Sequence, residues 1–217
     1  MSENRLIIYV SQIIILLAIF SYFYIDRSIA IFFHNFDVLS NHVWFISIFH
    51  DITKLGESQY ALLLLLSLFL IFRKKDPFIS YQILYLFTAV AISGIFVDIV
   101  KIVFARYRPE MLFQHDLYGF VGFKMGALFN SLPSGHSATA FALAIGLTFI
   151  VPRYKNFYFS IAILVASSRV ILTFHYLSDV LIGSLFGGII AFILYKKYFD
   201  VIITSKVPKS MPVGSPL

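Results

Sequence analysis

The sequence contains no cysteine, which excludes disulfide bonds and thiolate metal sites. It is also poor in charge: 13% of its 217 residues are Asp, Glu, Lys or Arg, whereas soluble domains carry about 25%. Hydrophobic residues make up 59% of the chain, and the mean hydropathy is +0.87. This composition excludes an ordinary soluble protein and predicts an integral membrane protein.

No block of basic residues accounts for the net charge of +6, because the cations are scattered among apolar runs. That distribution fits membrane topology, and no nucleic-acid partner is expected. The first apolar run is not followed by a small-residue cleavage site, since residues 20–24 read Phe-Ser-Tyr-Phe-Tyr. We therefore expect an uncleaved signal anchor.

The apolar runs predict an all-α polytopic membrane protein with six transmembrane helices, because about 20 apolar residues cross a bilayer. The expected spans are Leu6–Ile25, Leu55–Phe72, Phe78–Phe104, Ser137–Val151, Phe157–Phe174 and Leu177–Phe199. Residues 26–54 mix aromatic clusters with His and Asp, a pattern typical of short interfacial helices, here on the outer side. Residues 1–199 would form one membrane domain, and residues 200–217, with three prolines, a disordered cytoplasmic tail.

The distribution of Lys and Arg predicts the orientation. Six spans place both termini on one side, and that side with its two turns holds ten of the 17 cations. The seven others, with all six His, fall on the opposite side. We expect the termini in the cytoplasm and the opposite side facing outward. Small residues at helical spacing further predict close helix packing: Ala138, Ala142 and Gly146 in the fourth span, Gly183 and Gly187 in the sixth.

A polar stretch, residues 130–137, stands directly before the fourth span. Pro133 stops the preceding structure, Ser134 can cap the following helix, and Gly135 allows close approach to the backbone. His136 adds an imidazole. A helix N-terminus with free N–H groups suits an anion, although such a turn before a helix is usually only a cap.

Two further polar clusters lie at outer ends of spans. Lys101 and Arg108 are seven residues apart and share a face if the helix persists that far, with Pro109 ending it. Asp98 could simply neutralise Lys101. Arg169, His175 and Asp179 form the other cluster, in which a carboxylate one turn along can hold an imidazole in one tautomer.

Each of these residues has a structural explanation when taken alone. A cation at a span end is usually a snorkelling anchor, and a single His near an interface is usually structural. Such explanations do not account for three cations, two His and a carboxylate on one side of the membrane. Three converging cations repel one another unless an anion lies between them, and a doubly charged phosphate would roughly balance them with Asp179.

The three clusters resemble the three-part signature of the type 2 phosphatidic acid phosphatase superfamily. That signature is Lys, six residues, Arg-Pro; then Pro-Ser-Gly-His; then Ser-Arg, five residues, His, three residues, Asp. The sequence matches it at Lys101, Arg108-Pro109, residues 133–136, Ser168-Arg169, His175 and Asp179. The resemblance covers about residues 25–199, and one small departure is Leu132, where Phe is common.

The resemblance implies the role of each residue. His175 would be the nucleophile that forms a phosphohistidine, Asp179 would orient it, and His136 would act as general acid and then base. The phosphoryl oxygens would bind Lys101, Arg108, Ser134, Gly135 and Arg169. No cofactor and no metal are expected. The loop of residues 110–130 would line the entrance or anchor in the interface.

The expected partners are membrane lipids, and the expected substrate is a lipid phosphate. Its head group would enter the site at the periplasmic face of a bacterial inner membrane. The chain most resembles lipid A 1-phosphatases, with undecaprenyl pyrophosphate and phosphatidylglycerophosphate phosphatases as alternatives. Transfer of the phosphoryl group to another acceptor and a non-enzymatic lipid-phosphate transporter also remain open. Polar residues through the middle of the bilayer would favour a transporter, and the fourth and sixth spans have almost none. The oligomeric state is not predicted.

Overall fold

The structure, a computed structural model, describes residues 3–39 and 43–200. Within these ranges the chain is helical and has no β-strand. The helices are α1 (Glu3–Tyr24), α2 (Asp26–Leu39), α3 (Val43–Lys54), α4 (Ser58–Phe72), α5 (Pro77–Phe104), α6 (Pro109–His115), α7 (Gly135–Ile150), α8 (Lys155–Ile171) and α9 (Leu177–Leu194). Short 3-10 turns cover Ala127–Phe129 and Pro152–Tyr154, and a π turn, Tyr195–Phe199, extends α9. The all-helical prediction is confirmed, and the predicted tail lies almost wholly outside the described residues.

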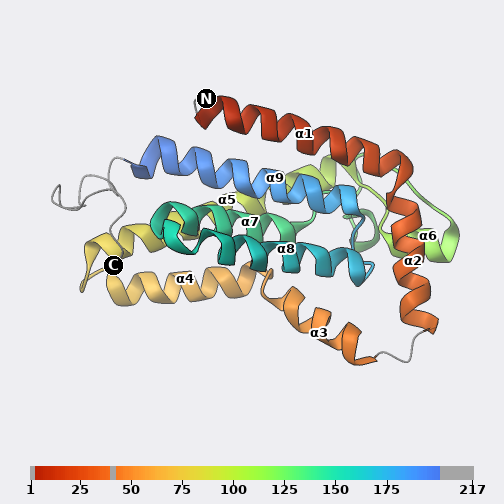
Figure 1. Cartoon of the computed structure of the whole chain (residues 1–217), viewed down its shortest axis with the longest axis horizontal. Helices are drawn as coiled ribbons and strands as arrows, with labels where there is room; N and C mark the ends of the chain where they lie inside the picture. The colour runs from red at the N-terminus through yellow and green to blue at the C-terminus, as the bar shows by residue number, and fades with distance from the viewer. Residues whose placement is uncertain (1–2, 40–42, 201–217) are drawn as a thin grey trace.

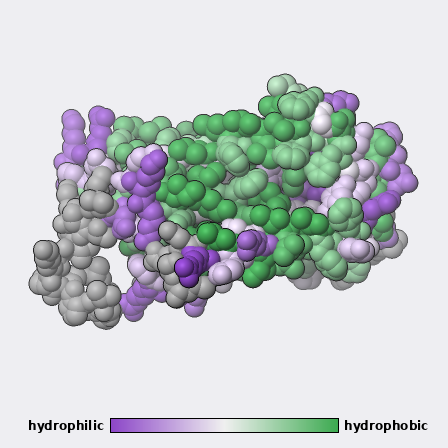
Figure 2. Space-filling view, turned by 90° about the horizontal axis from the view of Figure 1, so that it is seen from above, coloured by the Kyte–Doolittle hydropathy of each residue, from purple (hydrophilic) through white to green (hydrophobic). Residues whose placement is uncertain are grey.

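Six long helices run alongside one another, and the shorter α2, α3 and α6 gather at one end of the molecule (Figure 1). Each of the six overlaps one of the six predicted spans, with ends that differ by up to three residues when α9 is taken with its π turn. Three of them, α1, α5 and α9 with its π turn, are long and apolar enough to cross a membrane singly. The pair α3–α4, bent by 44°, would make a fourth, while α7 is apolar but shorter. The space-filling view shows an apolar middle between hydrophilic ends (Figure 2).

The core forms where α7 packs against α9, and glycines bring the two backbones together. A Cβ on Gly183 would lie 2.3 Å from the carbonyl oxygen of Ser134, and one on Gly187 would lie 2.1 Å from that of Ala138. Neither distance is possible for a real side chain, so only glycine fits at both positions. The predicted packing through small residues is confirmed.

The chain between α5 and α6 differs from the prediction. Helix α5 ends at Phe104, where Ala105 takes a left-handed φ of 39°, so no continuous helix joins Lys101 to Arg108. Pro109 begins α6, with Arg108 as its N-cap, and does not end a helix. The reason is that proline suits the first position of a helix, whose N–H has no intrahelical partner.

Candidate active site

The N-terminus of α7 forms one wall of the site. Ser134 is the N-cap, and its hydroxyl accepts hydrogen bonds from the Ser137 N–H at 3.4 Å and the Ser137 hydroxyl at 2.9 Å. The predicted cap is therefore confirmed. At the next residue, Gly135, a Cβ would lie 3.5 Å from the amine of Lys101. The amine of Lys101 thus lies beside the first turn of α7, where the helix dipole favours an anion.

The three predicted cations approach this helix end from three separate elements. Lys101 lies in the last turn of α5, Arg108 caps α6, and Arg169 lies in the last turn of α8. Lys101 is within electrostatic range of both arginines. His136 is within range of all three cations and of His175. The structure therefore brings together residues that are up to 74 positions apart in the chain.

A carboxylate lies near each of these cations: Asp98 near Lys101, Glu110 near Arg108 and Glu57 near Arg169. The amine of Lys101 lies 3.5 Å from Asp98, as the spacing suggested. Arg169 donates to the Thr53 hydroxyl at 2.7 Å and packs over the Phe174 ring at 4.5 Å. The Nε atoms of Arg108 and Arg169 are buried without a hydrogen-bond partner, as is that of Arg106. Buried charged donors without partners are costly, and an oxyanion between them would satisfy them.

His175 is buried in the α8–α9 loop and is held by a backbone carbonyl. Its Nδ1 lies 2.7 Å from the carbonyl oxygen of Ser131 and 3.8 Å from the nearer carboxylate oxygen of Asp179. The expected pair of His175 and Asp179 is thus present at 3.8 Å, and the Ser131 carbonyl is the nearer acceptor. An Nδ1–H donated to this carbonyl leaves Nε2 with a free lone pair.

The environment keeps His175 neutral. Burial lowers its pKa to about 4, with Arg169 and Arg108 adding to the shift and the Asp179 carboxylate opposing it. Desolvation disfavours the imidazolium cation, as does a nearby positive charge. The ring is thus uncharged near neutral pH and can act as a nucleophile.

Asp179 is fully buried and accepts several hydrogen bonds. Its partners are the Arg106 guanidinium, the Ser131 hydroxyl at 2.6 Å and the Tyr176 N–H at 2.9 Å. The last contact also caps α9. Arg106 was not among the predicted site residues. It lies in the spacer between Lys101 and Arg108, and its second carboxylate partner, Asp26, is 80 positions away.

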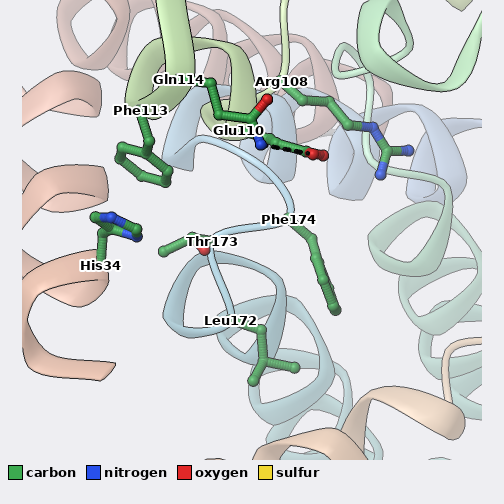
Figure 3. Close-up of a pocket in the computed structure, with 8 residues that line it drawn as sticks. All are labelled: His34, Arg108, Glu110, Phe113, Gln114, Leu172, Thr173 and Phe174. Atoms are coloured by element: carbon green, nitrogen blue, oxygen red, sulfur yellow. Dashed lines mark hydrogen bonds between the residues drawn. The ribbon is translucent and has the colours of Figure 1, made fainter. Parts of the chain in front are cut away.

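Two cavities adjoin the cations. One, of about 290 Å³, lies between α2, α6 and the α8–α9 loop, and its lining includes Arg108, Phe113, His34 and Phe174 (Figure 3). The rings of His34 and Phe113 face each other there at 3.9 Å between centroids. Helix α6, the first part of the predicted loop, therefore borders the site.

The second cavity, of about 220 Å³, lies between the α3–α4 corner, α5 and α7. His136, Lys101 and Gly135 line it together with two acidic residues, Glu57 and Asp98.

Comparison with known proteins identifies the same superfamily as the three-part signature. The PAP2 superfamily model matches residues 82–203, more than half of the chain. Lipid A 1-phosphatases of Rhizobium etli and Rhizobium johnstonii are 36% and 34% identical over 111 residues, which are 51% of this chain. These residues are 48% and 46% of the two relatives, so the chain spans about half the length of the curated proteins it matches. Lipid phosphate phosphatase 1 of Arabidopsis thaliana is 29% identical over 64% of this chain and 52% of the relative.

Two solved structures have a similar fold. Aquifex aeolicus LpxE aligns with a TM-score of 0.61 at 25% identity, covering 79% of this chain and 95% of that one. A transmembrane PAP2-type phosphatidylglycerolphosphate phosphatase from Bacillus subtilis aligns with a TM-score of 0.57 at 24% identity, covering 94% and 98%.

Fold and site together define a helical protein that has helices long and apolar enough to span a membrane and a cluster of cations and histidines where several of its helices end. The chain belongs to the PAP2 superfamily, and the recognition made from its three-part signature is confirmed.

Proposed function

We propose that this protein is a membrane lipid phosphatase that acts through a phosphohistidine. The observation that carries the proposal is the convergence of Lys101, Arg108 and Arg169 on two histidines, with buried guanidinium Nε atoms that have no partner. A phosphoryl group would satisfy these donors, and the cations would stabilise charge developing on its oxygens. The Ser134–Gly135 turn would add its hydroxyl and backbone N–H groups.

The two histidines take complementary roles. The lone pair on Nε2 of His175 attacks phosphorus, and the bond to the leaving oxygen breaks as His136 donates a proton to that oxygen. Neutral His136 then takes a proton from water, whose oxygen attacks phosphorus and releases His175 and inorganic phosphate. Phosphohistidine formation needs His175 uncharged, which its lowered pKa supports.

The same arrangement is proposed to work without a metal. Lys101, Arg108 and Arg169 would each repel a metal ion bound among them. Guanidinium forks and the N-terminus of α7 supply the charge stabilisation that a divalent ion supplies elsewhere.

The proposed setting is a bacterial inner membrane crossed six times, with α2 and α3 in the outer interface and the site facing the periplasm. The apolar middle of the surface and the six long helices support it. Lipid tails would then stay in the bilayer while the phosphate reaches the cations.

The proposed substrate is lipid A 1-phosphate, because both Rhizobium relatives carry the name lipid A 1-phosphatase. The cavity beside His136 supports a monophosphate, since Glu57 and Asp98 would repel a second phosphate on the leaving group. Their carboxylates can accept hydrogen bonds from sugar hydroxyls and N–H groups. Phosphatidylglycerophosphate, undecaprenyl pyrophosphate and transfer to another acceptor are the alternatives.

The test is phosphate release by the purified protein in detergent, measured in parallel on lipid A, phosphatidylglycerophosphate and undecaprenyl pyrophosphate. We expect release to be fastest from lipid A, to persist in a chelator and to disappear in His175→Ala. Full activity of His175→Ala would refute the nucleophile, and release from none of the three lipids would refute the function. A phosphorylated acceptor in place of free phosphate would indicate transfer.

A further inference from the structure

Arg106 is the largest side chain that the described residues bury completely. Its guanidinium donates to Asp179, at the start of α9, and to Asp26, at the start of α2, the latter at 2.8 Å. It also donates to the hydroxyls of Ser178 and Tyr118. Burial opposes its charge, but the two carboxylates outweigh this and raise its pKa. One buried cation thus joins two buried carboxylates from distant parts of the chain.

Asp26, like Arg106, is buried and makes several hydrogen bonds. One carboxylate oxygen accepts from the Ser21 hydroxyl at 2.6 Å and from the Ser178 N–H at 3.0 Å. Since α2 begins at Asp26, the carboxylate fixes the α1–α2 junction to the first turn of α9. Removing one partner from such a buried pair leaves an uncompensated charge, so the contacts are interdependent.

The network reaches His175 through Ser131. The Arg106 carbonyl accepts from the Ser131 N–H at 3.1 Å, and Asp179, held by the Arg106 guanidinium, accepts from the Ser131 hydroxyl at 2.6 Å. Ser131 is thus fixed through its N–H and its hydroxyl. Its carbonyl oxygen lies 2.7 Å from Nδ1 of His175. Arg106 therefore positions Ser131, which in turn positions the imidazole of His175. The Arg106 carbonyl acts on Ser131 directly, and the Arg106 guanidinium acts through Asp179.

We propose that Arg106 and Asp26 are positioning residues that fix the orientation and the Nδ1–H tautomer of His175, so that Nε2 faces the phosphorus. The inference rests on the proposed function for the reaction, but the tautomer can be measured without it. Arginine is required because its planar fork reaches two carboxylates at once, whereas lysine is a single point charge.

The variants are Arg106→Lys, which keeps the charge and loses the bridge, and Asp26→Asn, which keeps the shape and loses one charge. Arg27→Gln is the matched control, because Arg27 is adjacent to Asp26 and forms an exposed 3.0 Å ion pair with Asp116. Phosphate release from lipid A in detergent gives kcat and KM, thermal unfolding gives the folded fraction, and 15N NMR gives the His175 tautomer, assigned by its loss in His175→Asn.

We expect kcat to fall by about 100-fold in Arg106→Lys, the effect of roughly 1 Å of misplacement, with KM nearly unchanged. The Nδ1–H signal should weaken or move in both variants, and Arg27→Gln should match the wild type. Folded variants with wild-type kcat and tautomer would overturn the inference, and so would a loss of kcat that only tracks loss of folded protein. If the wild type released no phosphate, the proposed function would fail, and the NMR signal alone would decide the inference.

Discussion

At the scale of single residues, His175 gives a pH prediction with a definite sign. Burial and two arginines lower its pKa to about 4, so it loses its proton well below neutral pH. Because the neutral ring is the nucleophile, kcat/KM should fall as pH drops through about 4, and not near the ordinary value of about 6.5. The measurement is kcat/KM for lipid A from pH 3 upward, with buffers of constant ionic strength.

Returning each acid-treated sample to pH 7 separates titration from unfolding, because only titration reverses at once. Arg169→Gln provides the internal comparison. It removes a cation that disfavours the imidazolium, so the acid limb should move to higher pH even though phosphate binding is weakened. A wild-type limb near pH 6.5 would contradict the burial argument.

Some single residues of the candidate site could be predicted from the sequence, and others could not. Ser134, Gly135 and His136 follow one another and carry a local signal, the start of a helix, so the cap was predictable. Arg106 was not, because its partners lie 73 and 80 positions away and no local spacing links them. The Ser131 carbonyl that holds His175 has no signal either, since any residue supplies a carbonyl.

At the scale of elements, the prediction concerns α7 and α9. In Gly187→Leu the new side chain would collide with the Ala138 carbonyl, so the two helices must separate. Overpacking costs about 1–3 kcal/mol, and here it also displaces the start of α7, so the melting temperature and phosphate release should both fall. Gly94→Ala is the control for stability, because a Cβ there meets nothing within 4 Å. An unchanged melting temperature of Gly187→Leu would contradict the packing.

Helix positions were predictable because long apolar runs must be helical in a bilayer. Where α5 ends was not, since Val103 to Arg108 contains no glycine or proline to mark the break at Ala105. Backbone bridges from Arg106 to Phe120 and Asn130 replace the helical hydrogen bonds there. These contacts with the later loop, and not a local preference, determine the end of the helix.

At the scale of the whole molecule, the direction of the helices separates the site from the ends of the chain. Helix α1 begins and α9 ends at one end of the molecule, whereas α2, α3 and α6 lie at the other (Figure 1). There α2 and α6 line a cavity together with Arg108 and the α8–α9 loop. If the termini are cytoplasmic, as the excess of Lys and Arg on their side predicts, the site must face outward.

The absence of cysteine makes this orientation directly testable, because one introduced thiol is then the only one in the protein. Phe123 is 82% exposed in the loop between α6 and α7, and Lys74 is exposed in the turn between α4 and α5. In intact spheroplasts a membrane-impermeant maleimide should label Phe123→Cys, and it should label Lys74→Cys only after the membrane is opened. Both variants must still release phosphate from lipid A, which shows that they are folded. The reverse labelling pattern would place the site in the cytoplasm and exclude a periplasmic phosphatase.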